Sequence, residues 1–500
     1  MSTRVFRGHI ACRRALFFRR YATESRAFAQ KPSAFGQPLF ESHPHLVQRN
    51  ELTPGFTAEE YETRRRKLMD GLPESSIVVC VGGTIKYMSG MIFYKFRQAS
   101  DFRYLTGFDE PDSAVVLEKT SRSPKGYRMT LFSAGRDPAK EKWDGARTTF
   151  EDSKALFDAD DALSIEKFAD HLKPLILRYS NVFADLPSTG RKAMSARSLL
   201  QYLTPSIAPR NSSDDVIDAL RSSKPKPLAP KIARLRAIKS KAELDVMQRA
   251  AEISGRAHAK TMRFTRPGMS EGALAAHFEY ICALAGSERP AYVPVVASGA
   301  NALIIHYTSN NHLIDENDML LIDAACEYDG YASDITRSFP ASGTFSPPQR
   351  DLYTAVLTVQ KALVKLCTES SGMSMHDIHN RTCSLLADEL KQIGISPPAR
   401  ELEQVLFPHY VSHPIGLDLH ESAHFDRFGG LKEGMVITIE PGIYIPPSSA
   451  YPSHFHNIGI RIEDEVVVGK EHSTVLTAAA PKEIEDVEGA CQGLLGFEAY

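Results

Sequence analysis

The chain has 500 residues, of which 43% are hydrophobic and 24% charged, with a formal net charge of -2. This near-neutral charge argues against a nucleic-acid binder whose affinity comes from phosphate neutralisation, and no run approaches the roughly 18 apolar residues of a membrane span. The length predicts two domains. The seven cysteines are odd in number, scattered and never paired as C-x-x-C. They predict free thiols in a reducing compartment.

Residues 1–36 are predicted to be a mitochondrial targeting segment and linker. Six arginines precede the first acidic residue, Glu24, and apolar residues lie between them. An Arg-rich, acid-poor amphipathic start is typical of a transit peptide; a disordered basic tail is the alternative. The sequence Arg19-Arg20-Tyr21-Ala22 resembles a matrix-processing junction, with cleavage after Arg20 and later removal of Tyr21. We therefore expect a mitochondrial protein, located in the matrix.

Residues 45–221 are predicted to form a smaller α/β domain. A capping box at Thr57–Glu60 opens a helix that runs to Leu68. Strands alternate with helices, which favours a parallel or mixed sheet. The predicted strands are Ser76–Val81, Ala114–Leu117 and Arg128–Phe132, and the predicted helices are Ala159–Leu177 and Ala193–Leu203. The Pro-rich residues 222–230 are the predicted linker.

Residues 231–485 are predicted to form the second domain, in which two helices followed by strands occur twice. The first half contains helices Lys241–Met262 and Ser270–Ala285 and strand Val293–Ala297. The second half contains helices Pro348–Cys367 and Met375–Ile393 and strands Met435–Ile439 and Ile458–Val468. This order suggests a duplicated half, although no sequence repeat is evident.

A hairpin is predicted between Leu320 and Pro340, because two apolar runs flank the turn pair Asp329-Gly330. A two-residue turn pairs Tyr328 with Tyr331 and places Asp323 opposite Thr336. Asp334 then lies diagonally from Asp323 on the same face. Two carboxylates on a buried face need a positive partner, and a metal cation supplies one. The alternative is a solvated face with two ordinary acids.

Three further residues extend this candidate metal site. His413 lies near apolar residues, Glu440 ends one apolar strand, and Glu463 lies in another. Each has a simpler interpretation, as a core histidine, a strand-end acid and an exposed acid respectively. Together with the aspartates they form a mostly oxygen ligand set that suits Mn²⁺, with Co²⁺ or Zn²⁺ as alternatives. Four carboxylates predict two ions, and Arg461 is placed to hydrogen-bond one of the ligands.

The order Asp323, Asp334, His413, Glu440, Glu463 resembles the pita-bread metallopeptidases, which include methionine aminopeptidase, aminopeptidase P and prolidase. The segments that resemble aminopeptidase P are Ile305-His306-Tyr307, Asp334-Ile-Thr-Arg337, His409-Tyr-Val-Ser-His413 with His420-Glu421, Ile439-Glu440-Pro441-Gly442-Ile-Tyr444, Arg461-Ile-Glu463 and, upstream, Tyr104-Leu-Thr-Gly-Phe108. The resemblance spans about residues 45 to 470. It implies an α/β (α+β) protein with a C-terminal pita-bread catalytic domain. Tyr410 departs from it, because many relatives have glycine there.

The resemblance also implies a role for each residue. Asp323 would bind one metal ion, Asp334 and Glu463 would bridge both, and His413 and Glu440 would complete the second site. Glu440 would also accept a proton from the attacking water. The remaining catalytic positions would be His306, His409 and His420, which orient the peptide and stabilise the intermediate, and Arg461, which steadies Asp323 or its neighbours.

With its presequence, the chain resembles the mitochondrial aminopeptidase P-like group, including the fungal intermediate-cleaving peptidases. The implied activity is removal of one N-terminal residue from peptides or imported proteins after presequence cleavage. A strict X-Pro aminopeptidase or X-Pro dipeptidase would share every ligand, and a metal-free peptide-binding or creatinase-like protein on the same fold is a further alternative. Family members commonly form dimers or higher homo-oligomers. Trp143 is a candidate contributor to a neighbouring active site, with core packing as the alternative.

Overall fold

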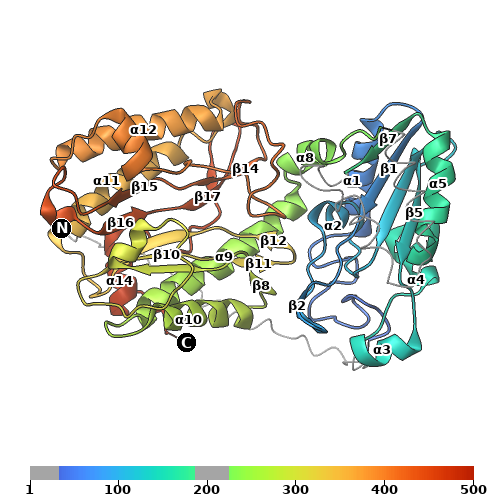
Figure 1. Cartoon of the computed structure of the whole chain (residues 1–500), viewed down its shortest axis with the longest axis horizontal. Coiled ribbons are helices and arrows are strands. Elements are labelled where there is room, and N and C mark those ends of the chain that lie inside the picture. Colours follow the sequence, from blue (N-terminus) through green and yellow to red (C-terminus); the bar gives the residue numbers. More distant parts are fainter. Residues whose placement is uncertain (1–32, 186–223, 500) are drawn as a thin grey trace, which may run out of the picture.

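The computed structural model describes residues 33–185 and 224–499, and these form two domains that lie side by side (Figure 1). Most of the predicted targeting segment and the predicted helix Ala193–Leu203 lie outside the described residues. Among the described residues, no helix is both long enough and apolar enough to cross a membrane. The architecture is the predicted pair of a smaller α/β domain and a larger mixed domain.

The N-terminal domain is built on a five-stranded mixed sheet with the order β6-β5-β4-β1-β7. The strands β1, β4 and β5 are antiparallel neighbours, whereas β7 and β6 add to the two edges in parallel. The bounds are β1 Ser76–Val81, β4 Ala114–Lys119, β5 Tyr127–Ser133, β6 Asp161–Ser164 and β7 Asn181–Ala184. The predicted mixed sheet is confirmed.

Helices cover both faces of this sheet (Figure 1). The side chain of Thr57 caps α1 by accepting from the backbone N–H of Glu60, as predicted. One apolar cluster joins α1 and α2 to the sheet, and another joins α5 to the opposite face. The bounds are α1 Ala58–Asp70, α2 Ser100–Thr106, α3 Pro138–Asp144, α4 Phe150–Phe157 and α5 Phe168–Arg178.

The predicted helix Ala159–Leu177 is wrong in its first half. Residues Asp161–Ser164 form β6, which pairs in parallel with Thr130–Ser133 of β5. Asp160 fixes the start of this strand, because its carboxylate accepts from the backbone N–H of Met129 at 2.8 Å. The sheet edge therefore overrides a helical pattern that is genuine only from Phe168 onward.

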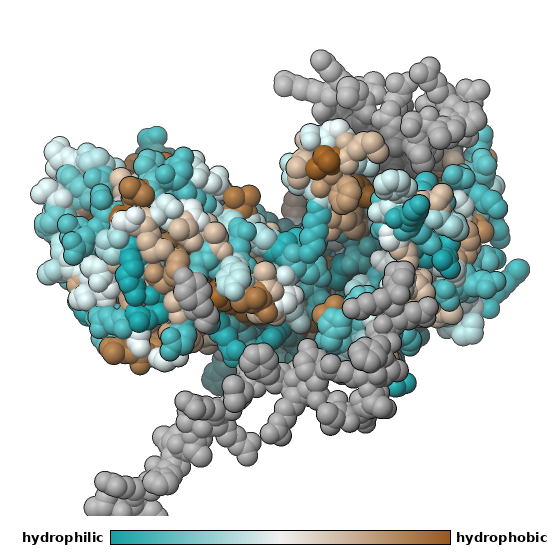
Figure 2. Space-filling model, turned by 90° about the horizontal axis from the view of Figure 1, so that it is seen from below, coloured by the Kyte–Doolittle hydropathy of each residue, from teal (hydrophilic) through white to brown (hydrophobic). Residues whose placement is uncertain are grey.

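A short apolar hairpin, β2 (Tyr87–Ser89) and β3 (Ile92–Phe93), projects from the N-terminal domain at the end where α3 lies (Figure 1). The side chains of six of its residues are 54–88% exposed, namely Tyr87, Met88, Met91, Ile92, Phe93 and Tyr94. Trp143 of α3 is 84% exposed, so core packing does not account for it. Figure 2 looks onto this end of the molecule and shows brown apolar patches among polar residues.

The C-terminal domain repeats two helices followed by strands, as predicted. The first half contains α9 Lys241–Phe264, α10 Glu271–Leu284, β8 Arg289–Pro290, β9 Val295–Ser298, β10 Met319–Asp323, β11 Cys326–Tyr328, β12 Tyr331–Ala332 and β13 Thr336–Pro340. The second half contains α11 Pro347–Val364, α12 Met375–Gln392, α13 Ala399–Glu401, β14 Val436–Ile439, β15 Gly442–Ile445, β16 Ile458–Arg461, β17 Asp464–Val467, β18 Thr474–Val475 and α14 Ile484–Gln492. These strands form small antiparallel sheets, β13-β10-β9, β12-β11-β8, β14-β17-β18 and β15-β16. The helices lie on the outside of these sheets (Figure 1).

The register of the central hairpin follows the prediction. Tyr328 pairs with Tyr331, and Asp323 pairs with Thr336. Asp329 and Gly330 both have positive φ, 49° and 81°, which is the backbone conformation that a tight Asp-Gly turn requires. The hairpin therefore brings its two aspartates to one place.

The predicted strand Ile458–Val468 is two strands in different sheets. The chain leaves β16 after Arg461 and joins β17 at Asp464. Between them the N–H of Glu463 donates to the carbonyl of Thr336 at 3.1 Å, and the buried guanidinium of Arg337 donates to the Glu463 carbonyl. The break turns the Glu463 side chain toward the aspartates.

Helix α8 (Ala229–Ala237) connects the two domains. Its Arg236 donates at 2.7 Å to Glu421 and Asp418 of the C-terminal domain and to Asp101 of the N-terminal domain. Within the predicted linker, Lys226 pairs with Phe183 at the edge of the N-terminal sheet. The domain boundaries stay predictions.

Candidate metal centre

A cavity of about 440 Å³ in the C-terminal domain contains every sequence-predicted site residue. The lining comes from both halves of the domain, because the hairpin supplies the aspartates and β14 to β17 supply the glutamates. The lining residues are Tyr292, Val293, Val295, Ile305, His306, Thr308, Asp323, Asp334, His409, Tyr410, Ser412, His413, Leu419, His420, Arg427, Glu440, Arg461 and Glu463.

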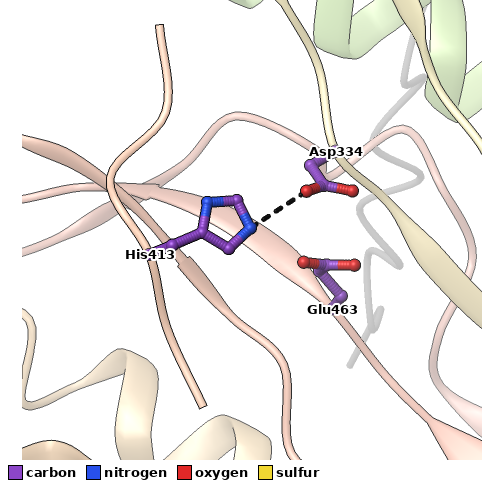
Figure 3. A group of neighbouring side chains, drawn as sticks. All are labelled: Asp334, His413 and Glu463. Atoms are coloured by element: carbon purple, nitrogen blue, oxygen red, sulfur yellow. Dashed lines mark ion pairs between the residues drawn. The ribbon is translucent and has the colours of Figure 1, made fainter. Parts of the chain in front are cut away.

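Asp334, His413 and Glu463 all line this cavity, and their side chains point toward one another (Figure 3). One ligand atom from each lies within 4.8 Å of the others, and all three residues are buried. The Nε2 atom of His413 lies 3.2 Å from Oδ2 of Asp334 and 3.7 Å from Oε1 of Glu440. These side chains converge on one point from three separate segments.

Asp323 joins the cluster through a tyrosine that sequence reasoning missed. The hydroxyl of Tyr292 contacts Oδ1 of Asp323 and, at 2.7 Å, Oδ1 of Asp334. Tyr292 immediately precedes the predicted strand at Val293, and a tyrosine there carries no signal that separates it from a core aromatic residue. Its contacts confirm that the two aspartates of the hairpin are neighbours.

Arg461 connects three parts of the site. Its Nη2 donates to Oδ2 of Asp323 at 2.6 Å, its Nη1 to the hydroxyl of Tyr444 at 2.7 Å, and its Nε to Oγ1 of Thr336 at 2.9 Å. The Thr336 hydroxyl in turn donates to Oε2 of Glu463 at 2.7 Å. Arg461 therefore fixes Asp323 directly and Glu463 through one hydroxyl.

The carboxylates of the cluster repel one another in a buried place. Burial raises the pKa of Asp334 well above its usual range, and the neighbouring Asp323 raises it further. Burial and the neighbouring Glu463 raise the pKa of Glu440. Burial and the neighbouring Asp334 likewise raise the pKa of Glu463. Such shifts arise where negative charge is brought together without enough positive charge. A cation between these groups would remove the conflict.

The donor set fits a divalent metal ion. The Nδ1 atom of His413 lies 3.2 Å from the carbonyl of Pro414, so Nδ1 carries the proton and Nε2 presents its lone pair to the carboxylates. The Thr438 hydroxyl positions Oε1 of Glu440 at 3.3 Å. The backbone N–H of Asp334 donates to Glu465 at 2.8 Å. Oxygen donors with one imidazole suit Mn²⁺, Co²⁺ or Zn²⁺.

The three other predicted histidines have different surroundings. His306 is exposed at the cavity wall. The ring of His420 lies 4.2 Å from that of His413, and burial together with His413 lowers the pKa of His420 to about 4. Both ring nitrogens of His409 are engaged, by the Tyr410 carbonyl at 3.0 Å and the Tyr444 hydroxyl at 2.9 Å. His409 is thus placed to hold Tyr444, and its direct contact with substrate stays a prediction.

Tyr410 is a rigid part of the cavity wall. Its ring stacks on His379 with centroids 4.4 Å apart, and the guanidinium carbon of Arg427 lies 5.0 Å from its centroid. Its hydroxyl lies 3.2 Å from Nδ1 of His376. The departure from glycine at this position therefore places a fixed aromatic ring beside the predicted ligands.

The structure excludes the simpler interpretations of several predicted residues. Asp334 and Glu463 are only 5% and 2% exposed, so neither is a solvated surface acid. Tyr292 is a polar contact that the sequence did not identify. Tyr444 ends the motif that begins at Ile439, but the sequence assigned it no role. The cysteines in the described residues are free thiols, and five of the six are buried.

This fold and site define a pita-bread metallopeptidase. Residues 245–470 match the model of metallopeptidase family M24, and residues 61–183 match the aminopeptidase P N-terminal domain. The chain is 40% identical over 461 residues to intermediate cleaving peptidase 55 of Saccharomyces cerevisiae, covering 92% of this chain and 89% of that one. It is 37% identical to Xaa-Pro aminopeptidase 3 of Rattus norvegicus, covering 95% and 94%. The Arabidopsis thaliana relative, at 36% identity over 91% and 87%, is named intermediate cleaving peptidase 55, mitochondrial.

Solved structures agree with these matches. The crystal structure of Icp55 from Saccharomyces cerevisiae superimposes with a TM-score of 0.80 at 37% identity, covering 89% of this chain and 99% of that one. Zn-substituted Escherichia coli aminopeptidase P in complex with product gives 0.77 at 30% identity, covering 88% and 99%. The chain belongs to the M24 metallopeptidases, with the aminopeptidase P domain arrangement, and is a hydrolase. The predicted fold, enzyme class and mitochondrial location are confirmed.

Proposed function

We propose that this enzyme removes a single N-terminal residue from mitochondrial proteins after presequence cleavage. The observation that carries the proposal is the convergence of Asp334, His413 and Glu463 within 4.8 Å inside the family cavity. The similarity to intermediate cleaving peptidases along most of the chain supports this substrate class. The substrate is therefore a peptide or protein N-terminus.

We infer that Asp323, Asp334, His413, Glu440 and Glu463 hold two divalent metal ions, with Mn²⁺ as the preferred ion and Co²⁺ or Zn²⁺ as alternatives. The zinc form of the Escherichia coli enzyme is consistent with this donor set. When bound, such a pair of ions supplies activation of water and polarisation of the scissile carbonyl. The raised pKa values of the buried carboxylates are the cost that bound cations would offset.

The chain's own residues would perform the remaining steps. Glu440 would accept a proton from the attacking water at its carboxylate and pass it to the leaving amine. His306 and His420, whose rings face the cavity, would donate to the peptide carbonyl as negative charge develops there. Arg461 and Tyr292 would keep Asp323 in place.

The second candidate is a strict X-Pro aminopeptidase, which the similarity to Xaa-Pro aminopeptidase 3 favours. An X-Pro dipeptidase would share the same ligands. A metal-free binding protein on this fold is disfavoured, because all five ligand positions are occupied by metal-binding side chains. The intermediate-cleaving peptidase and the strict X-Pro aminopeptidase differ in whether the second substrate residue must be proline.

Two matched peptides separate these candidates. The mature chain from Ala22 onward would be assayed with Mn²⁺ on Tyr-Ala-Thr-Glu-Ser and Tyr-Pro-Thr-Glu-Ser. Tyrosine release from both at comparable rates supports the proposed function. Release from the proline peptide alone makes the protein an X-Pro enzyme, and release from neither, in a preparation without bound metal, contradicts the enzyme mechanism.

We also propose that the protein forms a homodimer or higher homo-oligomer. The apolar hairpin of β2 and β3 and the exposed Trp143 leave a large apolar surface on one end of the N-terminal domain. A cluster of exposed apolar side chains is typical of a protein interface. A second copy of the chain would cover it and would bring Trp143 close to a neighbouring active site.

A further inference from the structure

Glu271 is a buried carboxylate outside the metal cluster, at the first residue of α10. Its side chain has no exposed surface. Oε1 accepts from the Ser298 N–H at 2.9 Å, the Ser298 hydroxyl at 2.8 Å and the Asn301 amide at 2.9 Å. Oε2 accepts from the Tyr307 hydroxyl at 2.8 Å and the His312 N–H at 3.0 Å. One side chain therefore receives five hydrogen bonds.

All five donors lie between residues 298 and 312, the segment that carries His306 to the cavity. Within it, Ile304, His306, Thr308 and Ser309 are exposed. Ala302 and Tyr307 are buried in a small apolar cluster, the Asn310 side chain bonds the neighbouring strand, and the groups bound by Glu271 are further anchors of the segment. Tyr307, the residue after His306, is one of those groups. The position of His306 thus depends on a neighbour that Glu271 holds.

The site requires a carboxylate. The Ser298 N–H, which donates to Oε1, and the His312 N–H, which donates to Oε2, are donors only, so both oxygens of residue 271 must accept. Burial alone would raise the pKa of Glu271, but the hydrogen bonds from Asn301, His312 and Ser298 lower it below its usual range. A glutamine would turn an N–H₂ group toward at least one of these donors and leave it without an acceptor.

We propose that Glu271 is a positioning residue for hydrolysis: it fixes the segment 298–312 and thereby holds His306 against the bound peptide. This inference rests on the proposed function for the role of His306 in contacting the peptide. Glu271 itself touches neither the predicted ligands nor the cavity. Its effect on catalysis is therefore transmitted entirely through the segment that it binds.

A double-mutant cycle between Glu271→Gln and His306→Ala tests this transmission. Kinetics with Mn²⁺ on Tyr-Ala-Thr-Glu-Ser should show kcat reduced by roughly 10- to 100-fold in E271Q, because small displacements of a catalytic group are costly. In the H306A background, E271Q should cause no further loss. The matched control is Glu243→Gln. Glu243 is another buried glutamate, on α9, and it accepts hydrogen bonds from the Tyr331 hydroxyl and the Ser240 N–H. E243Q should retain kcat within about twofold.

Hydrogen exchange provides a second test that needs no activity. E271Q should exchange faster within residues 298–312 than the wild type, while E243Q should leave that segment unchanged. The proposal would be overturned if the losses in the cycle were additive, or if either H306A or E271Q had wild-type kinetics. It would also be overturned if hydrogen exchange of the segment were unchanged in E271Q. A wild-type enzyme that hydrolyses neither peptide would contradict the proposed function, and the exchange result would still decide whether Glu271 anchors the segment.

Discussion

Arg461 donates to Asp323 at 2.6 Å from a strand of a different sheet, and both residues are remote from each other in sequence. The guanidinium also donates to Tyr444 and Thr336, so each of its three nitrogen atoms makes a hydrogen bond. Lysine, with a single ammonium group, cannot reproduce these three directed contacts. The contact therefore links both halves of the domain at the metal site.

Replacing Arg461 with lysine should weaken metal binding and catalysis together. We expect roughly a 10- to 100-fold loss in metal affinity, because residues that orient ligands contribute effects of this size. Bound metal per chain, measured after dialysis, and kcat report the two effects. Arg350→Lys on the surface of α11 is the control and should change neither. Normal metal content and kcat in R461K would show that the contact is dispensable.

Asp334→Asn should separate stability from metal binding. Because buried carboxylates crowd this site, we expect the chelated variant to melt a few degrees above the chelated wild type. Adding Mn²⁺ should stabilise the wild type far more than the variant. Thermal melting with chelator and with Mn²⁺ measures both differences. An equal metal-induced shift in the two proteins would exclude Asp334 as a ligand.

The pair of Glu421 and Arg236 between α8 and the C-terminal domain predicts acid sensitivity. Burial acts to raise the pKa of Glu421, but Lys239 and Arg236 outweigh it and lower the pKa to about 2, against an ordinary value of 4.5. A depressed folded-state pKa contributes stability above pH 4.5 that is lost as the pH falls toward 2. At neutral pH, E421Q should lower the free energy of unfolding by about 3 kcal/mol, because it takes the carboxylate partner from the buried Lys239 and removes one of the three carboxylates that pair with Arg236.

Urea unfolding midpoints of the wild type and E421Q, compared between pH 7 and pH 3, check this account. The difference in unfolding midpoint between the wild type and E421Q should be largest at neutral pH and should decrease as the pH falls below 4.5. The surface variant Glu369→Gln should match the wild type at pH 7. A difference in unfolding midpoint that stays constant across this pH range would mean that Glu421 is not held ionised by its partners.

The apolar hairpin predicts a concentration-dependent assembly. Met91, at 88% exposure, and Phe93 lie on it, and charged residues there would make burial against a second copy unfavourable. Sedimentation should show the wild type as a dimer or larger species and the double variant Met91→Lys, Phe93→Glu as a monomer. Leu177→Lys, an exposed apolar position on α5, should not change the mass. A monomeric wild type would rule out the proposed homo-oligomer.

Sequence patterns predicted the elements that local rules determine. The Asp329-Gly330 turn fixed the register that places Asp323 opposite Thr336, because a tight turn leaves a single pairing. The caps at Thr57 and Ser270 fixed the starts of their helices. Apolar strands indicated that Glu440 and Glu463 lie in a buried setting, and in the structure Glu463 is buried and Glu440 partly buried. These signals depend on neighbours in the chain.

Contacts between distant segments could not be predicted in the same way. The break between Arg461 and Asp464 depends on the Thr336 carbonyl and on Arg337, more than 120 residues away. Tyr292 bridges two aspartates only after β9 and the hairpin have assembled. The five donors of Glu271 are likewise supplied by a segment that begins 27 residues later. Long-range packing, which no local pattern encodes, decides such contacts.

The proposed removal of one N-terminal residue is tested most directly by the identity of N-termini in mitochondria. Processed matrix proteins, including this enzyme, would be sequenced at their N-termini from cells with the wild type and from cells with Glu440→Gln as the only copy. We expect the wild type to yield chains shortened by one residue, with this enzyme beginning at Ala22, and E440Q cells to retain chains beginning at Tyr21. The same one-residue-shorter N-termini in both cells, or an enzyme that begins at Tyr21 in wild-type cells, would contradict the proposed removal.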